Sequence, residues 1–134
     1  MKTLTILLAL TFSVMFSSPS FAEWKKVGRN VSGTTYYVDL ERIRKHGGYV
    51  YFWRIRNYLK PDKWGDLSSK VYNQGDCKLF RYKVLSASFH KEPMGRGTDS
   101  AVQMTGESYT PPDKWKYPPP ESSIEEILKR VCNR

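Results

Sequence analysis

The residues YVYFWRIRNYL, at positions 49–59, alternate between two kinds of side chain. Large apolar residues recur at a spacing of two on one face: Tyr49, Tyr51, Trp53, Ile55 and Leu59. Arg54 and Arg56 fall on the opposite face. This alternation is typical of an antiparallel strand that buries one face and exposes the other to solvent. We therefore expect a sheet in which the arginines of this strand point outward.

Upstream of this segment, strand-forming residues are interrupted by turn residues. Residues 23–39 predict two short strands around a turn at Asn30-Val31-Ser32-Gly33, and residues 40–45 predict a single helical turn. The sequence His46-Gly47-Gly48 predicts the turn that leads into position 49.

Downstream, residues 60–66 predict a turn, and residues 67–72 and 79–89 predict two more strands. Gly, Ser, Thr and Pro dominate residues 98–120. That composition fits either an ordered loop that crosses the domain or a mobile one.

The C-terminal residues 122–132 carry the clearest helix signal. Ser122 and Glu125 have the spacing of a capping box, in which each side chain accepts a hydrogen bond from an otherwise unpaired amide, and Ser123 and Glu126 offer the same pattern one residue later. An apolar stripe follows at helical spacing: Ile124, Ile127, Leu128, Val131 and Cys132. Several strands followed by one helix indicate an α+β domain.

Residues 1–22 have the three parts of a secretory signal. Lys2 is positive, residues 4–16 are mostly apolar, and Ser20-Phe21-Ala22 places small residues at a cleavage site. The apolar stretch is too short, and too rich in Ser and Thr, to span a hydrocarbon core of roughly 30 Å. We expect export and a mature chain that begins at Glu23. We expect no lipid anchor, because no cysteine lies at the cleavage point.

Cys77 and Cys132 are the only cysteines. In a small exported domain an isolated pair is more often a disulfide than a metal site or a nucleophile. Because Cys132 lies on the apolar stripe, a bond to Cys77 would hold the buried face of the helix to the sheet.

The chain is strongly basic, with 22 Lys and Arg against 13 Asp and Glu, a formal net charge of +9. Removing residues 1–22 from 134 leaves 112 residues and takes away only Lys2, so the domain 23–134 keeps +8. That length fits one domain with one core. The charge favours anionic partners such as lipid head groups, sulfated polysaccharide, acidic protein patches or nucleic acid. The alternative is a solvated basic surface, because Lys and Arg are spread along the whole chain.

The sequence Pro-Asp-Lys-Trp occurs twice, at residues 61–64 and 112–115. Pro presets a turn backbone and Asp accepts a local amide, so turn chemistry alone can explain the repeat. The functional alternative is two loops that each present Trp beside Lys, to stack on a sugar ring or to dock a peptide. The candidate binding residues are therefore Trp64, Trp115, Lys63 and Lys114, followed by Arg54 and Arg56.

Known catalytic patterns are absent from the sequence. No Ser-His-Asp order, metal-ligand cluster or nucleotide-binding glycine loop occurs, so we expect no cofactor and no enzyme activity. His46 and His90 could supply the acid and base of a small nuclease. We expect instead that His46 lies in an exposed turn and that His90 ends a strand.

Several short motifs occur in order along the chain. They are Thr35-Tyr36-Tyr37-Val38-Asp39, Ile43-Arg44-Lys45-His46-Gly47-Gly48, Tyr58-Leu59-Lys60-Pro61-Asp62, Asp76-Cys77, Met94-Gly95-Arg96-Gly97 and Val131-Cys132. In this order and spacing the sequence resembles the surface-adhesin protein E family of Gram-negative bacteria. The resemblance implies a single curved antiparallel sheet of about six strands, with a C-terminal helix packed on one face and disulfide-linked to it. It also implies adhesion to host extracellular-matrix proteins such as laminin and vitronectin.

These observations define three hypotheses. The first is an exported, non-enzymatic, adhesin-like protein that recognises a host or envelope macromolecule, an extracellular-matrix protein according to the resemblance. The second is a periplasmic accessory protein that binds an anionic glycolipid or polysaccharide, and the third is a small secreted nuclease. Each is compatible with the periplasm, the medium or the cell surface, and with a dimer.

We predict that the exported protein begins at Glu23 and carries no acyl group. Intact-mass measurement of the product from periplasm or medium checks both points, because cleavage after Ala22 and lipid addition each change the mass by a known amount. As a control, Ala22→Trp removes the small residue at the cleavage site and should leave the precursor uncleaved. A different first residue, or the added mass of an acyl chain, would contradict the prediction.

Overall fold

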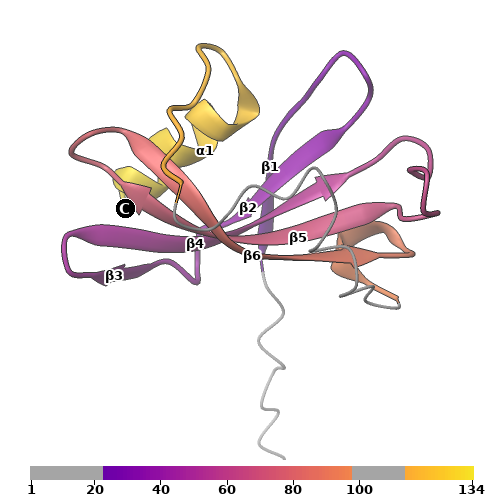
Figure 1. Cartoon of the computed structure of the whole chain (residues 1–134), viewed down its shortest axis with the longest axis horizontal. Coiled ribbons are helices and arrows are strands. Elements are labelled where there is room, and N and C mark those ends of the chain that lie inside the picture. The colour runs from indigo at the N-terminus through magenta and orange to yellow at the C-terminus, as the bar shows by residue number, and fades with distance from the viewer. Residues whose placement is uncertain (1–22, 98–113) are drawn as a thin grey trace, which may run out of the picture.

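Six antiparallel strands and a C-terminal helix dominate the part of the chain that this computed structural model describes, residues 23–97 and 114–134 (Figure 1). The elements are β1 (Trp24–Arg29), β2 (Thr35–Asp39), β3 (Arg44–His46), β4 (Tyr49–Asn57), β5 (Ser68–Asp76), β6 (Arg81–His90), the 3-10 helix η1 (Pro93–Gly95) and α1 (Ser123–Cys132). One open sheet contains all the strands in the order β1-β2-β4-β5-β6, and β3 pairs with β4. The α+β class and the six-stranded sheet are confirmed. The predicted signal and residues 98–113 lie outside the described residues.

β4 shows which face of the sheet meets the helix. Val50 and Phe52 are buried in one cluster with α1, so Arg54 and Arg56, at the next alternate positions, share this helix face. Trp53 and its alternate neighbours lie on the opposite face, which we call the outer face. The expectation that the arginines point outward was therefore wrong. Both faces of β4 carry apolar residues, and packing with the helix selects the face of Val50 and Phe52.

The helix is held by the burial of one apolar stripe, as its spacing predicted. Its buried residues are Ile124, Ile127, Leu128 and Val131. They pack against Val38, Val50, Phe52 and Tyr82 of the sheet. Each such side chain stabilises the fold by about 1.5–3 kcal/mol when it is fully buried. The hydroxyl of Ser122 accepts a hydrogen bond from the Glu125 amide at 3.2 Å, which confirms the predicted N-cap.

Gly75 of β5 lets the helix approach the sheet closely. A Cβ atom at this position would lie 2.8 Å from Val50 Cγ2 and 2.9 Å from Leu128 Cδ1. Neither neighbour is free to move, because Val50 is 5 % exposed and Leu128 is fully buried. Glycine is thus required here by contact distance.

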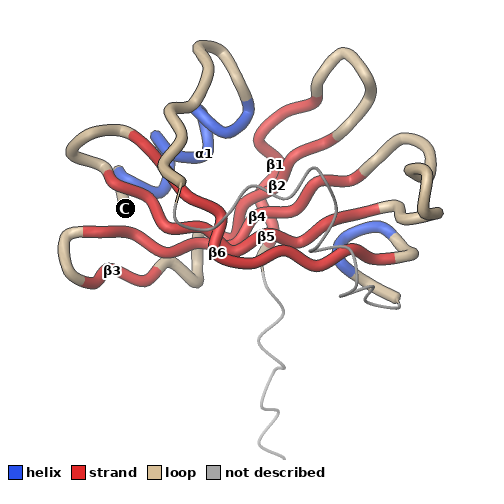
Figure 2. The backbone as a smooth tube through the Cα atoms, in the orientation of Figure 1, coloured by secondary structure: helices blue, strands red, loops and turns tan. Residues whose placement is uncertain are grey.

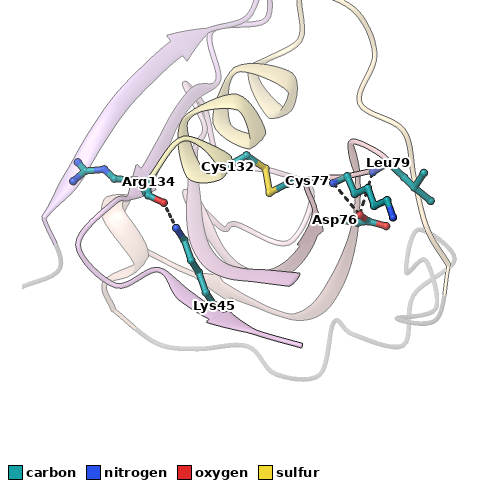
Figure 3. Close-up of a disulfide and its surroundings, with 7 residues drawn as sticks. Lys45, Asp76, Cys77, Leu79, Cys132 and Arg134 are labelled. Carbon is teal, nitrogen blue, oxygen red and sulfur yellow. Dashed lines mark hydrogen bonds between the residues drawn. A yellow bond between two sulfur atoms is a disulfide. The ribbon is translucent and has the colours of Figure 1, made fainter. Parts of the chain in front are cut away.

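A disulfide between Cys77 and Cys132 joins the end of α1 to the turn after β5 and confirms the predicted pair (Figure 3). In Figure 3 the ribbon of the sheet curves around the helix. Beside the disulfide, the Lys45 ammonium donates a hydrogen bond to the carbonyl of Arg134. The helix C-terminus is therefore tied to both β3 and β5.

Residues 40–45 do not form the predicted helical turn. The Asp39 carboxylate accepts hydrogen bonds from the amides of Glu41 and Arg42, at 3.1 and 3.3 Å, and it pairs with the Arg42 guanidinium. This side chain replaces the backbone acceptors that a helix would supply. The chain then enters β3, which pairs with Tyr49–Tyr51 across the predicted His46-Gly47-Gly48 turn.

η1 covers one end of the outer face, and α1 lies on the other side of the sheet (Figure 2). Asn57 Oδ1 accepts from the Met94 amide at 2.8 Å, and Ser68 Oγ accepts from the Gly95 amide at 2.9 Å. Beneath η1, Ile55 is fully buried. η1 does not cover the part of the outer face nearer to β3, and the aromatic side chains of the candidate site lie there.

The two edges of the sheet differ. β1 pairs with β2 only, among the described residues, and its register shifts between Lys26 and Gly28. Along β6, Tyr82 forms an antiparallel bridge with Lys116 through two backbone hydrogen bonds of 2.8 and 2.9 Å. The segment that precedes α1 is therefore fixed against the β6 edge.

We predict that the double variant Cys77→Ala/Cys132→Ala loses about 4 kcal/mol of unfolding free energy. The bond closes a sequence separation of 55 residues, and the unfolded chain gains entropy when it is removed. Urea denaturation followed by tryptophan fluorescence measures the loss. Leu79→Ala, an exposed position in the adjacent turn, is the matched control and should stay within about 0.5 kcal/mol of the wild type. Equal midpoints for the double variant and the wild type would contradict the prediction.

Candidate functional site

The outer face carries two groups of aromatic rings, which are neighbours along β4. Trp53 stacks on Tyr72 of the neighbouring strand at 4.7 Å between ring centroids, and Tyr51 lies 6.3 Å from the same ring. Tyr49, the next outer-face residue of β4, lies 5.6 Å from the ring of Trp115. All five side chains are half-buried. Together the five side chains span β4, β5 and the segment beside β6, and we call them the outer-face stripe.

Cations are stacked on both ends of the outer-face stripe. At one end the Lys70 ammonium lies 4.8 Å from the Trp53 ring centroid. At the other end Arg81 and Lys83 each lie 4.4 Å from the Trp115 ring. Each such contact stabilises the protein by about 0.5–1 kcal/mol at an exposed site.

The acidic groups near the outer-face stripe are already paired. Asp76 Oδ2 binds Arg81 Nε at 3.0 Å, and Asp39 binds Arg42. Burial lowers the pKa of Lys70, and repulsion by Arg42 lowers it further, against the attraction of Asp39. The surface around the rings is therefore positive, and its cations are held in place before any ligand arrives.

Trp115 belongs to the outer-face stripe because of the bridge between Tyr82 and Lys116. Side chains alternate along this short extended segment, so Trp115 turns to the outer face while its neighbours Lys114 and Lys116 do not share its position. Lys114 is exposed. The preceding Pro112 and Asp113 of the second Pro-Asp-Lys-Trp sequence lie outside the described residues.

Trp64 and Lys63 lie elsewhere, in the loop between β4 and β5. Asp62 Oδ1 accepts from the Trp64 amide at 3.0 Å, which is the turn chemistry expected of this sequence. Trp64 is 47 % exposed, and the Lys63 ammonium lies 4.3 Å from its ring. This loop precedes Ser68, whose partner His90 ends β6, whereas Trp115 meets Arg81 at the beginning of β6. The two predicted tryptophan sites are therefore at opposite ends of that strand.

Arg54 and Arg56 are on the helix face, away from both tryptophans. Arg54 is 8 % exposed, and its Nε donates to Asn73 Oδ1 at 3.3 Å. Arg56 is half-buried, and its Nε donates to Ser69 Oγ at 3.0 Å. Trp64 with Lys63, Trp115, and the two arginines thus lie in three different places, and the charge of Lys114 acts on Lys116 together with those of Arg54 and Arg56.

The two histidines are too far apart to act together. His46 pairs with Tyr49 at the start of β4, whereas His90 is aligned through Ser68 with Asn57 at its end. His90 is buried, and its Nε2 lies 2.8 Å from Ser88 Oγ. The described residues also contain no cluster of three His, Cys, Asp or Glu side chains that could hold a metal ion.

The outer-face stripe was missed because sequence reasoning assigned the rings of β4 to the core and placed Trp115 in a separate turn. A signal was present, since Arg81 and Lys83 alternate on the predicted strand 79–89 and so must share one face. What the stripe can do chemically is bind an extended partner. Rings offer flat apolar area to sugars or aromatic side chains, and the stacked cations bind carboxylate, sulfate or phosphate substituents.

Comparisons with known proteins agree with the fold. A family model described as Surface-adhesin protein E matches residues 24–133. Crystal form II of Haemophilus influenzae protein E superposes with a TM-score of 0.59 and 19 % identity, over 84 % of this chain and 89 % of that one. Protein E from non-typeable Haemophilus influenzae gives a TM-score of 0.54 and 18 % identity, over 87 % and 79 %. No curated protein sequence matches the chain.

In the described part of the chain, no helix has both the length and the apolar character needed to cross a membrane.

We predict that Asp76→Asn lowers stability at neutral pH and removes part of its pH dependence. Burial by itself raises the pKa of the Asp76 carboxyl, but hydrogen bonds from the Leu79 amide and Arg81, with the charge of Arg81 and the Lys78 amide, hold this pKa below its usual 3.8. Because the folded pKa is depressed, the stabilisation is complete above the unfolded pKa and is lost as the pH falls through the folded value. Urea denaturation should give a difference of about 1–3 kcal/mol at neutral pH that shrinks below about pH 4.

The control for this measurement is Glu23→Gln, which removes a surface carboxylate 3.6 Å from Lys25 and should change stability little. If the Asp76→Asn and wild-type profiles run parallel from neutral to acid pH, the inferred role of Asp76 is wrong.

Proposed function

The chain belongs to the surface-adhesin protein E family, and on that premise we propose that it is an exported, non-enzymatic protein that binds a host or envelope macromolecule. The single observation that supports this binding site is the outer-face stripe, in which five half-buried rings carry three stacked cations at the two ends. An extracellular-matrix protein is the proposed partner.

The stripe suits a macromolecule because it is long, shallow and rigid. Its rings span three neighbouring segments of the sheet, and each is fixed by a ring contact or a cation contact. Rigid aromatic side chains lose little conformational entropy on binding, and for this reason they are enriched among residues that dominate binding energy. The proposed mechanism is apolar contact with the rings, with Lys70, Arg81 and Lys83 aligning acidic groups of the partner.

A second candidate is a periplasmic protein that binds an anionic glycolipid or polysaccharide. The observation in its favour is that cations lie directly on the rings, so that one sugar unit can meet an apolar face and a positive charge together. Salt separates the two candidates. Release of counterions from a polyanion by three cations implies a loss on the order of tenfold in affinity between about 50 and about 200 mM salt. Binding centred on rings should change less.

We predict that Trp115→Ala weakens binding to immobilised laminin or vitronectin at least about tenfold, with Tyr72→Ala similar in effect. Surface plasmon resonance measures the affinities, and circular dichroism checks that each variant is folded. Heparin and purified lipopolysaccharide serve as probes of the second candidate function. Trp64→Ala is the comparison variant, because it removes an equally large ring from the loop between β4 and β5, which lies near the opposite end of β6. Loss of binding in Trp64→Ala alone would place the site in the Lys63–Trp64 loop and overturn the proposal for the stripe.

A further inference from the structure

Within residues 23–97 and 114–134, the helix face contains two arginines that have no carboxylate partner. Arg54 is 8 % exposed and Arg56 is half-buried, and neither forms an ion pair within the described part of the chain. A buried guanidinium without a counterion is costly, and buried charges are normally paired. The same protein does pair its buried acids: Asp39, Asp66 and Asp76 each bind a Lys or Arg. The unpaired arginines are therefore an exception that calls for an explanation.

Both arginines are held in the same way. Arg54 Nε donates to Asn73 Oδ1, and Arg56 Nε donates to Ser69 Oγ, so each guanidinium is tethered to β5 through the same atom. The tethers are themselves fixed, because Asn73 and Ser69 are fully buried and Asn73 Nδ2 donates to the Val71 carbonyl at 3.1 Å. An arginine tethered at Nε keeps its two terminal nitrogens for another acceptor. Among the described residues these nitrogens have no hydrogen-bond partner.

Other positive and polar groups converge on the same place. The Arg54 guanidinium lies 5.8 Å from the ring centroid of Tyr82, whose backbone bridges Lys116. Burial, and then repulsion by Arg56, lower the pKa of Arg54 to about 10. Burial also lowers the pKa of Lys116, and the charges of Arg54, Lys114 and Arg56 lower it further. The cations on this part of the helix face are thus close enough to repel one another.

We propose that Arg54 and Arg56 form a binding site for a phosphate or sulfate group, independent of the outer-face stripe. A terminal pair of guanidinium nitrogens binds two oxygens of an oxyanion at once, and a tetrahedral dianion has enough oxygens for both arginines. A dianion also offsets the mutual repulsion of the cations better than a carboxylate does. The group is either a free phosphate or sulfate or the phosphate of a lipid head group, and both present the same oxygens.

The test compares thermal unfolding in sodium phosphate, sodium sulfate, sodium acetate and sodium chloride at equal ionic strength. Ligand that binds only the folded state raises Tm. We expect phosphate and sulfate to raise the Tm of the wild type by several degrees over chloride, and acetate to raise it by much less. Arg56→Gln should abolish the rise in Tm. Arg56→Lys keeps the charge but loses the pair of nitrogens that binds two oxygens at once, so it should retain only a small part of the rise.

The matched control is Arg44→Gln, which removes an equal charge from the exposed strand β3. This variant should keep the full rise. Arg54→Gln should also abolish the rise in Tm. Because Arg54 is buried, this variant can fail to fold, and the test then rests on the variants of the half-buried Arg56. Titration of the wild type with phosphate should also shift the Nε–Hε NMR signals of Arg54 and Arg56 before those of Arg44.

Vesicle flotation distinguishes the two sources of the phosphate group. Phosphatidylcholine vesicles with phosphatidic acid should retain more wild type than Arg56→Gln if a lipid head group is bound, and equal amounts if only free phosphate or sulfate is. The proposal is overturned if Arg56→Gln keeps the full phosphate-dependent rise in Tm, or if saturating phosphate leaves both arginine signals unmoved. Because Arg56→Gln leaves the outer-face stripe intact, its binding to laminin or vitronectin reports separately on the proposed function.

Discussion

The close approach of α1 to the sheet at Gly75 goes with the choice of the face that becomes the core. A side chain at this position of β5 would meet both Leu128 and Val50 at less than 3.0 Å, so the helix can settle only where glycine leaves room. Once α1 lies there, alternation along β4 fixes every other side chain. Arg54 and Arg56 must share the face of the helix, and Tyr51 and Trp53 must turn away from it. The location of both candidate sites follows from this close approach of α1 to the sheet.

Much of the fold could be predicted from local patterns, whereas the candidate site could not. The Ser122 cap and the apolar stripe specify α1, and the lone cysteine pair specifies the disulfide, because these signals are contained in a few neighbouring residues. β4 was recognised as a strand, but its two faces were exchanged, since the large rings appeared more apolar than Val50 and Phe52. Trp115 was predicted as a binding residue in a turn, and that role stays a prediction. Its place in the structure depends on the bridge at Tyr82, a long-range pairing that leaves no local pattern in the sequence.

The protein handles its excess positive charge differently on its two faces. On the outer face Lys70, Arg81 and Lys83 lie over indole rings, where ring and cation present one mixed surface. On the helix face Arg54 and Arg56 are tied by Nε to uncharged partners and keep their terminal nitrogens. The first arrangement suits a broad partner with apolar and acidic parts, because contact area contributes to binding. The second suits a small group whose oxygens match the guanidinium geometry.

An open sheet also has edges, and an edge strand with unpaired amides is a template on which a strand of another molecule can add. In the described structure β1 occupies one such edge, with Lys25 and Lys26 exposed and the register shift just before Gly28. Charges and a bulge at an edge both oppose the addition of a further strand, because an incoming chain would meet an irregular hydrogen-bond ladder and would have to bury ammonium groups that are now exposed. β1 therefore disfavours the addition of a further strand at this edge of the sheet, so growth of the sheet from one molecule to the next is opposed there.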